Sequence, residues 1–398
     1  MNMLMIRILI CMGLMGVFAS CGDAYEYPWN SEWDKLTPEQ EDTTVTEPAD
    51  TTQTPEPPTE DPEPPTEDPE PPTGDPEPPT EDPEPEPDPP VDEPEPGPEV
   101  TPFDDWTDVS AQYGELPTYL KIYRSPDKLL GYKAVAYVAE ADMNQAQWDV
   151  WSVKIMENGG NLTEQTDDSF KTPSEVYASQ EFPVIINGGY FYYSGSNRYT
   201  ASFAVSGSEA LAYNIGYEYD DAGKMRYPTR AVFRQTSDGT FDACWTYTLW
   251  NRVSYMYPAP SEDVSKQPSA TYPAGAETFV AQTAIGGGPV LIDDGKIVNT
   301  YEQEMFSGIS PESAQPRTAI GVTADNRLYF FVCEGRQMTS EVYGYTTGEV
   351  AEILLGLGCV EAINLDGGGS SCMLVNGKET IKVSDGSQRA VASALMIK

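Results

Sequence analysis

The sequence predicts an α+β fold, with a mixed, strand-rich sheet and a few helices, in a single large domain after a disordered stalk. Short alternating segments rich in β-branched and aromatic residues recur through the C-terminal three quarters of the chain. Glycine and Asp/Asn turns separate these segments, and only two stretches show helical periodicity. A proline- and glutamate-rich stretch precedes them all.

The strand and helix expectations follow from these patterns. The clearest helix is expected over residues 347–357, with Thr346 and Glu349 as a capping box and Gly358 at its end. A weaker helix is expected over 173–179. The segment 347–357 joins two predicted strands, which indicates a β-α-β crossover. The expected strands are 133–139, 182–186, 231–233, 290–292, 318–322, 328–333 and 360–365.

The N-terminus is expected to be a lipoprotein signal peptide over residues 1–20. Its apolar stretch, 8–19, is too short to span a bilayer comfortably. Ala19 and Ser20 before Cys21 resemble a bacterial lipobox, in which the cysteine is lipidated. The alternative is a plain cleaved signal followed by an incidental cysteine. We therefore expect an exported bacterial lipoprotein on the outer membrane, at its periplasmic face or at the cell surface, with lipid on Cys21.

A stalk is expected over residues 38–99, after a mature N-terminal segment at 21–37. The stalk contains 23 Asp/Glu and 22 Pro, and Pro-Glu-Pro-Pro-Thr-Glu-Asp recurs with a seven-residue period. Proline forbids a helix, and high charge with low hydrophobicity forbids a packed core. An extended polyproline-II-like spacer would hold the domain at 103–398 away from the membrane. The alternative is a proline-rich ligand for a partner.

The composition excludes several classes of protein. Histidine is absent, which excludes Ser-His-Asp and Cys-His catalysis and every zinc site that contains histidine. A formal net charge of −41 argues against binding to nucleic acid. No C-x-x-C pair occurs, and the four cysteines of the domain are expected to be buried or disulfide-bonded, with three pairings open.

Three glycine-dense segments each follow a predicted strand directly. They are IINGGYF at 185–191, AIGGGPV at 284–290 and AINLDGGGSS at 362–371. Glycine lets backbone N–H groups approach a ligand closely or form an anion-binding nest. Each run taken singly is a tight turn, but the three together, two of them with Asn or Asp at the strand end, indicate a shared cleft.

Charged residues accompany two further predicted strands. Arg317 stands at the mouth of strand 318–322, and Glu334 and Arg336 lie just past strand 328–333. A carboxylate at a strand end can act as acid, base or nucleophile. The alternative is surface charge that is paired locally.

Four strings in order resemble the phosphodiester glycosidase domain family: INGGYF at 186–191, GGGPVLIDDGK at 286–296, QPRTAIGV at 315–322 and AINLDGGGSS at 362–371. The motif-bearing part extends over about 180–398. The resemblance implies hydrolysis of a sugar-1-phosphodiester at the anomeric carbon, which releases free sugar and a phosphomonoester. It implies no required cofactor, although a cation bound near Asp366 stays open.

The resemblance also suggests roles for individual residues. Asp366 and Glu334 are candidates for activating water and for stabilising charge at the sugar, in an order left open. Asn187 and Asn364 are expected to bind sugar hydroxyls or to orient the water. Arg317 is expected to bind the phosphate bidentately. Helpers in phosphate binding would be Arg336, the amides of Gly188, Gly189, Gly367, Gly368 and Gly369, and, more weakly, Ser370.

Two alternatives to this enzyme stay open. One is a non-catalytic glycan-binding surface lipoprotein with the same fold, whose Tyr and Trp side chains stack on sugars. The other is ordinary glycoside hydrolysis by the pair of Glu334 and Asp366, which predicts activity on aryl glycosides that lack phosphate.

Overall fold

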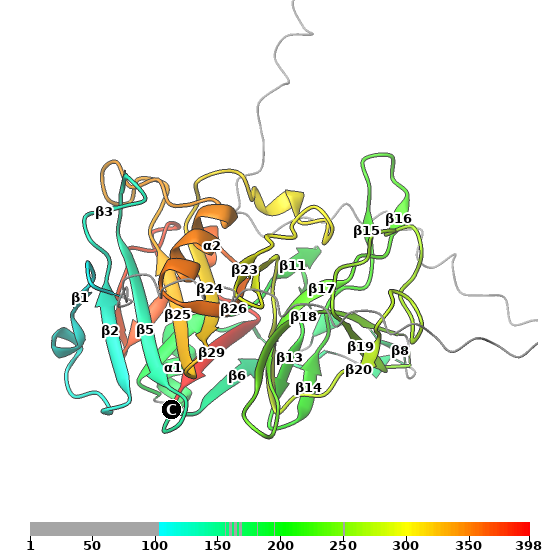
Figure 1. Ribbon diagram of the computed structural model, residues 1–398, viewed down its shortest axis with the longest axis horizontal. Helices are drawn as coiled ribbons and strands as arrows, with labels where there is room; N and C mark the ends of the chain where they lie inside the picture. The colour runs from blue at the N-terminus through cyan, green and yellow to red at the C-terminus, as the bar shows by residue number, and fades with distance from the viewer. Residues whose placement is uncertain are drawn as a thin grey trace, which may run out of the picture. The chain divides into compact units, whose positions relative to one another are not determined.

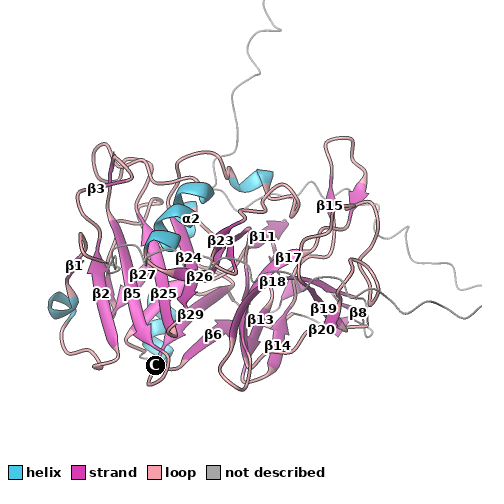
Figure 2. Cartoon of the chain, in the orientation of Figure 1, coloured by secondary structure: helices cyan, strands magenta, loops and turns pink. Residues whose placement is uncertain are grey.

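The computed structural model describes residues 103–398, apart from 156, 159–160, 163–164, 167–168, 181, 195 and 250. The predicted signal peptide, Cys21, the segment 21–37 and the stalk lie outside the described residues. Within the described ranges two α-helices accompany many strands, which confirms the strand-rich α+β fold class (Figure 2). No helix in this part of the chain is long and apolar enough to cross a bilayer.

The largest sheet has eight strands, and every neighbouring pair in it is antiparallel. Side chains alternate between its faces, so that Phe330 and Phe331 belong to different buried clusters. In spatial order the strands are β1 (Thr107–Asp108), β2 (Leu120–Arg124), β5 (Ala136–Asp142), β25 (Arg327–Cys333), β24 (Arg317–Thr323), β26 (Cys359–Asn364), β22 (Val290–Asp293) and β23 (Lys296–Ile297).

Both faces of the eight-stranded sheet are covered, which explains why β24 is buried along its whole length. Helix α2 (Thr347–Gly356) packs Val350 and Leu354 onto one face, in front of β24 and β26 in Figure 1. The other face packs against two more sheets. There Ile320 of β24 shares a buried cluster with Ile186 and Phe233.

These two sheets are also antiparallel throughout. The five-stranded sheet has the order β28 (Lys378–Glu379), β27 (Met373–Val375), β10 (Val184–Asn187), β29 (Ser393–Ile397) and β6 (Trp148–Ser152). The seven-stranded sheet has the order β14 (Glu209–Ala212), β13 (Ala204–Ser206), β21 (Thr283–Gly286), β17 (Arg230–Gln235), β18 (Phe241–Thr248), β19 (Ser254–Tyr257) and β20 (Glu277–Thr278).

The smaller elements lie around these sheets. Helix α1 is Pro173–Gln180, and single 3-10 turns are η2 (Ser110–Tyr113), η3 (Ser307–Ile309) and η4 (Gly368–Ser370). The short sheets are β11 (Phe191–Ser194), β12 (Asn197–Thr200) and β9 (Gln165–Thr166), with the pairs β3 (Lys128–Leu129) and β4 (Tyr132–Lys133), β7 (Glu157–Asn158) and β8 (Asn161–Leu162), and β15 (Glu218–Tyr219) and β16 (Met225–Arg226).

The ends of α2 match the sequence prediction. The Thr346 hydroxyl accepts the N–H of Glu349 at 3.1 Å, and the Glu349 carboxylate accepts the N–H of Thr346 at 2.8 Å. These two bonds are the predicted capping box. After the helix, Gly358 adopts a φ of 90°, a conformation that glycine reaches at little cost.

The predicted crossover differs from the one observed. β25 and β26 run parallel to each other, but β24 lies between them and is antiparallel to both. A tight turn with Asn326 at a φ of 62° joins β24 to β25. The two strands therefore pair as a hairpin, and β24 takes the place beside β25 that was expected for β26. The chain through α2 therefore passes over one strand. The strand expected at 133–139 also begins later, at Ala136, because β3 and β4 form a separate hairpin.

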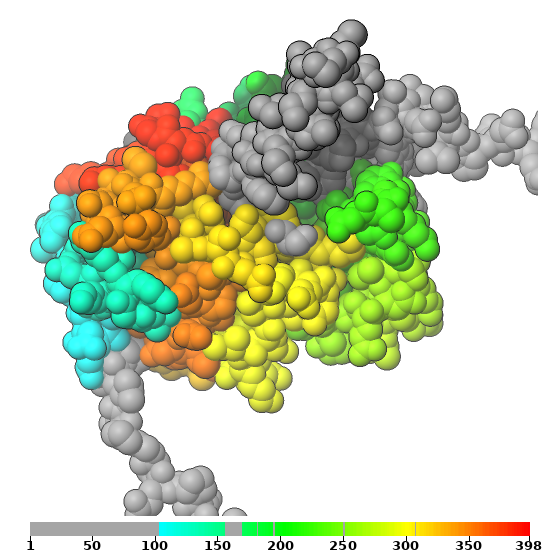
Figure 3. Space-filling model, turned by 90° about the horizontal axis from the view of Figure 1, so that it is seen from above, coloured from blue at the N-terminus to red at the C-terminus, as the bar shows by residue number. Residues whose placement is uncertain are grey.

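The loop after β23 is fixed by a buried carboxylate. Glu304 is fully buried, and its carboxylate accepts the N–H of Val290 at 2.9 Å, the N–H of Ala231 at 2.7 Å and the Thr300 hydroxyl at 2.6 Å. Burial raises the pKa of Glu304 above its usual range. Glu304 thus connects the loop after β23 to the eight-stranded sheet through Val290 and to the seven-stranded sheet through Ala231. This loop belongs to the yellow segment of Figure 3, between the orange and green segments.

Candidate active site

The three glycine-rich loops meet at one edge of the sheets. The N–H of Asp366 donates to the carbonyl of Gly188 at 3.1 Å, which joins the loop after β26 to the loop after β10. The N–H of Gly288 donates to the carbonyl of Asn364 at 2.7 Å, which adds the loop before β22. Segments more than 170 residues apart in the sequence are thereby brought together.

Asn187 connects these loops from inside the protein. Its side chain is fully buried, and its Oδ1 accepts the Thr318 hydroxyl at 2.8 Å and the N–H of Cys372 at 3.1 Å. Its Nδ2 donates to the carbonyl of Asp366 at 2.7 Å. These bonds make Asn187 a positioning residue for Asp366, and its expected role in binding sugar hydroxyls or orienting the water stays a prediction.

Asn364 is also buried between the loops, but unlike Asn187 it has a side-chain oxygen without a hydrogen-bond partner among the described residues. It is 1% exposed, and its Nδ2 donates to the carbonyl of Gly288 at 3.0 Å and to the Tyr190 hydroxyl at 2.9 Å. The Tyr190 hydroxyl in turn donates to the carbonyl of Gly288 at 2.6 Å. The Oδ1 of Asn364 is buried and has no hydrogen-bond partner among the described residues.

The glycines after β10 are required by packing. The N–H of Gly188 donates to the Ser393 carbonyl at 2.8 Å, and the N–H of Gly189 donates to the Ser393 hydroxyl at 3.0 Å. A Cβ on Gly188 would lie 2.4 Å from that hydroxyl oxygen. Both amides are bonded to β29 in this structure, and their expected part in an anion cradle stays a prediction.

The DGGGS loop is also bonded internally. The N–H of Gly367 donates to Oδ1 of Asp366 at 2.9 Å, and the N–H of Gly368 donates to the carbonyl of Pro316 at 2.9 Å. The expected role of these two amides in anion binding likewise stays a prediction. Glycine at position 369 lets the Asp385 side chain pack closely against the loop, because a Cβ there would lie 2.2 Å from Oδ2 of Asp385.

The carboxyl of Asp366 has a raised pKa. Burial raises the pKa of its carboxyl to about 6, although hydrogen bonds from Ser370 and Gly367 and the charge of Arg389 oppose that rise. The nearby charge of Asp385 adds to it. A carboxyl that titrates near neutral pH is suited to proton transfer.

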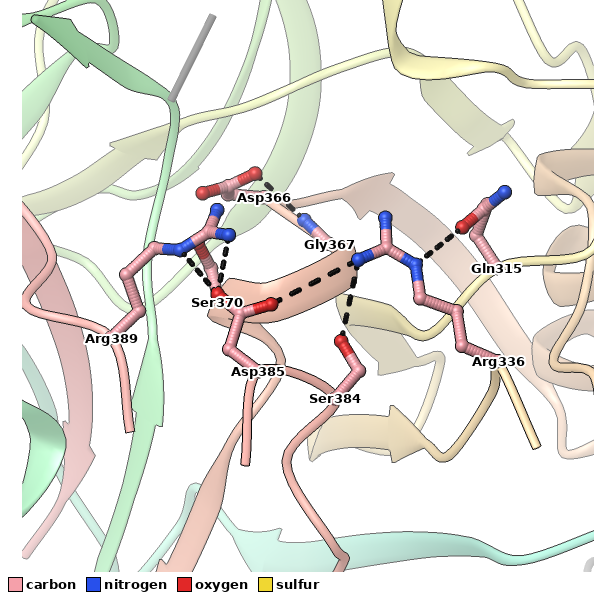
Figure 4. A network of polar contacts seen from close by, with 8 residues as sticks. All are labelled: Gln315, Arg336, Asp366, Gly367, Ser370, Ser384, Asp385 and Arg389. Carbon is pink, nitrogen blue, oxygen red and sulfur yellow. Dashed lines mark hydrogen bonds and ion pairs between the residues drawn. The ribbon is translucent and has the colours of Figure 1, made fainter. Parts of the chain in front are cut away.

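Arg389 and Asp385 lie near Asp366, and Arg336 approaches Asp385 from the side opposite Arg389 (Figure 4). Arg389 donates from Nε and Nη2 to Oδ2 of Asp385, at 3.0 and 2.5 Å. Nη1 of Arg336 lies 4.0 Å from Oδ1 of the same carboxylate. Nη1 of Arg389 also lies 3.5 Å from the Ser370 hydroxyl. Positive charge therefore borders the loop that carries Asp366.

Glu334 contacts the segment that leads to Asp385. It is 3% exposed, and its Oε1 accepts the N–H of Lys382 at 2.9 Å. Its Oε2 is buried without a hydrogen-bond partner among the described residues. The neighbouring Arg336 donates from Nε to Oε1 of Gln315 at 3.0 Å.

Arg317 does not have the surroundings that a phosphate-binding residue needs. Its side chain is 1% exposed, and Nε donates to the carbonyl of Tyr345 at 3.0 Å. Its Nη1 and Nη2 donate to the carbonyls of Ile309, Ser310 and Ser313 at 2.6 to 3.1 Å. The guanidinium binds backbone carbonyls of the loop before β24 and that of Tyr345, and its expected bidentate phosphate contact stays a prediction.

The four cysteines of the domain are buried and free, and none forms a disulfide in the described part of the chain. Burial raises their pKa values, which keeps the thiols protonated and unreactive. Across the described residues, no group of three or more Cys, Asp or Glu side chains is arranged to hold a metal ion.

Sequence reasoning missed Tyr190, Ser384, Asp385 and Arg389. Tyr190 lies within the string INGGYF, but nothing in that string distinguishes a bridging hydroxyl from a core side chain. Asp385 and Arg389 are four residues apart across a turn at Gly386, which has a φ of 77°. That spacing was the available signal for an ion pair.

Comparisons with known proteins show the family of the chain. A sequence model of the phosphodiester glycosidase family matches residues 180–398, which include every site residue described above. An uncharacterized prophage-derived protein of Bacillus subtilis, YomE, is 42% identical over 82 residues, which cover 21% of this chain and 12% of that protein.

Two solved structures are similar to the chain at lower sequence identity. The catalytic domain of zebrafish N-acetylglucosamine-1-phosphodiester alpha-N-acetylglucosaminidase, auto-inhibited by its pro-peptide, has 19% identity and a TM-score of 0.45, covering 73% of this chain and 87% of that one. A hypothetical protein from Synechocystis has 16% identity and a TM-score of 0.46, covering 70% and 62%. With more than half of its length matched by the family model, the chain belongs to the phosphodiester glycosidase family.

Proposed function

We propose that this protein hydrolyses a sugar-1-phosphodiester at the anomeric carbon and releases free sugar and a phosphomonoester. The observation that supports this most is that the loop carrying Asp366 adjoins two guanidinium groups, Arg389 and Arg336, which both approach the carboxylate of Asp385. Arginine is suited to a phosphodiester because its planar donors match two anionic oxygens.

In the proposed reaction Asp366 acts as the base. Water adds to the anomeric carbon while the bond from that carbon to the phosphate oxygen breaks, and the phosphate leaves with the electron pair. Asp366, ionised above a pKa of about 6, takes the proton of the water. A phosphate monoester is a good leaving group, so little acid assistance is needed. Glu334, through its unpartnered Oε2, would stabilise positive charge developing at the sugar.

The arginines supply the first test. The full chain is expected to release free sugar from a sugar-1-phosphodiester, with UDP-GlcNAc and related diesters of other sugars as a panel. Arg389→Gln should lower kcat/KM by about 100-fold, because a preorganised donor to the phosphate is lost. Arg234→Gln is the matched control, since Arg234 forms a similarly buried ion pair with Asp242 away from the site.

Aryl glycosides without phosphate separate the alternatives. If they are cleaved and Arg389→Gln has no effect on any substrate, the protein is an ordinary glycosidase. If every diester of the panel stays intact while a glycan binds, the non-catalytic alternative replaces the proposal.

The membrane anchor is the second part of the proposal. We propose that lipid on Cys21 attaches the protein to the outer membrane of a bacterium, because Ala19 and Ser20 precede that cysteine after an apolar stretch. Cys21→Ser should move the protein from the membrane fraction to the soluble fraction and abolish labelling by a radioactive fatty acid. Cys11→Ser, within the apolar stretch, should leave both unchanged. Labelling that persists in Cys21→Ser would contradict the anchor.

A further inference from the structure

The carboxylate of Asp385 interacts with both arginines of the site, Arg389 and Arg336. Arg389 approaches Oδ2 of Asp385 with two nitrogens, at 3.0 and 2.5 Å, and Arg336 approaches Oδ1 at 4.0 Å. Arg336 is also tied from Nη1 to the Ser384 hydroxyl at 3.5 Å. Figure 4 shows the carboxylate of Asp385 between the two guanidinium groups.

This ion pair is fitted closely onto the loop of Asp366. A Cβ on Gly369 would lie 2.2 Å from Oδ2 of Asp385 and 2.3 Å from Nη2 of Arg389. The Asp385 side chain is nevertheless 32% exposed, and that of Arg389 is 16% exposed. A ligand from solution can therefore reach the carboxylate without unfolding the loop.

A carboxylate and a phosphodiester present the same feature to a guanidinium. Each carries one negative charge shared by two oxygens, and each can accept two parallel N–H bonds. We infer that Asp385 occupies the position of the phosphodiester's anionic oxygens and must leave the two arginines when the substrate binds. This inference rests on the proposed function, and it makes Asp385 an internal competitor that limits affinity for the substrate's phosphate.

Charge favours this assignment over a purely structural ion pair. With Asp385 in place the three side chains carry one net positive charge, which a bound monoanion would have to share with a carboxylate. Like charges placed side by side oppose binding strongly. When the Asp385 carboxylate moves toward solvent it becomes fully hydrated. The phosphate can then bind both guanidinium groups.

The test measures binding of inorganic phosphate to the full chain by phosphorus-31 NMR and calorimetry. Asp385→Asn should bind phosphate about tenfold more tightly than wild type, because the competing charge is gone while the shape is kept. Asp385→Ser should behave likewise. Asp242→Asn is the matched control, since Asp242 is also 32% exposed and pairs with Arg234, and it should leave phosphate binding unchanged.

Adding Arg389→Gln to Asp385→Asn should remove the gain. Equal or weaker binding by both Asp385 variants would overturn the inference and show that the carboxylate only positions the arginines. Binding by neither wild type nor variant would overturn it too. Because phosphate binding needs no turnover, the inference and the proposed hydrolysis fail in different experiments.

Discussion

Asp366→Asn is expected to abolish turnover and to stabilise the fold in one step. If Asp366 is the base, the amide cannot take a proton from water, and kcat should fall by about 1,000-fold. The amide oxygen can still accept the N–H of Gly367, so the loop keeps its hydrogen bond. Loss of activity without loss of structure would place Asp366 in the chemistry.

The stability effect follows from the sign of the pKa shift. Burial raises the pKa of Asp366 from 3.8 to about 6 in the folded protein, so the folded state binds the proton more tightly than the unfolded state. Ionisation of this carboxyl therefore leaves the free energy of unfolding unchanged below about pH 4 and lowers it progressively between about pH 4 and 6. Above about pH 6 the loss is constant. Removing the charge should raise the free energy of unfolding by roughly 1–3 kcal/mol at pH 8, and by little at pH 4.

Urea unfolding at several pH values, with sugar release measured on the same samples, checks both effects. Asp293→Asn is the control, because burial also raises the pKa of Asp293, which lies on β22 away from the arginines. That variant should gain stability at high pH and keep its activity. An Asp366→Asn protein that still turns over, or that loses stability at pH 8, contradicts the assignment.

The fold was predictable where local patterns decide it. The capping box of Thr346 and Glu349 depends on four consecutive residues, and it forms as predicted. The central strands were found from their β-branched and aromatic residues. The insertion of β24 between β25 and β26 was not found, because strand order depends on contacts between distant segments and on the hairpin at Asn326.

The site was predictable only as a neighbourhood. The strings around Asn187, Gly288 and Asp366 were identified from sequence, and the structure brings them together. The roles of individual polar residues could not be read in the same way. The side-chain oxygen of Asn187 accepts hydrogen bonds from Thr318 and Cys372, which lie 131 and 185 positions away in the sequence. No local pattern reveals such contacts. Similarly, a sequence shows an arginine but not whether carbonyl groups already surround it.

Arg317 carries the clearest consequence of that difference, because Arg317→Met should destabilise the protein instead of impairing phosphate binding. The guanidinium donates to the carbonyl oxygens of Ile309, Ser310, Ser313 and Tyr345. Methionine fills much of the space but makes none of these four hydrogen bonds. A hydrogen bond to a charged group contributes about 1.5–3 kcal/mol, so the free energy of unfolding should fall by at least about 3 kcal/mol.

Arg389→Met provides the contrast, since the Arg389 side chain is 16% exposed and its partner Asp385, at 32% exposed, can be hydrated. That variant should change the free energy of unfolding by less than about 1 kcal/mol and should lose phosphate binding. Urea unfolding and phosphate titration of both variants compare the two effects directly. If Arg317→Met were as stable as wild type and only its phosphate binding were lost, the phosphate contact would belong to Arg317 after all, and the loop before β24 would have to open to admit the substrate. The opposite result assigns the two arginines separate work, one in the fold and one in binding, although both stand close to a glycine-rich loop.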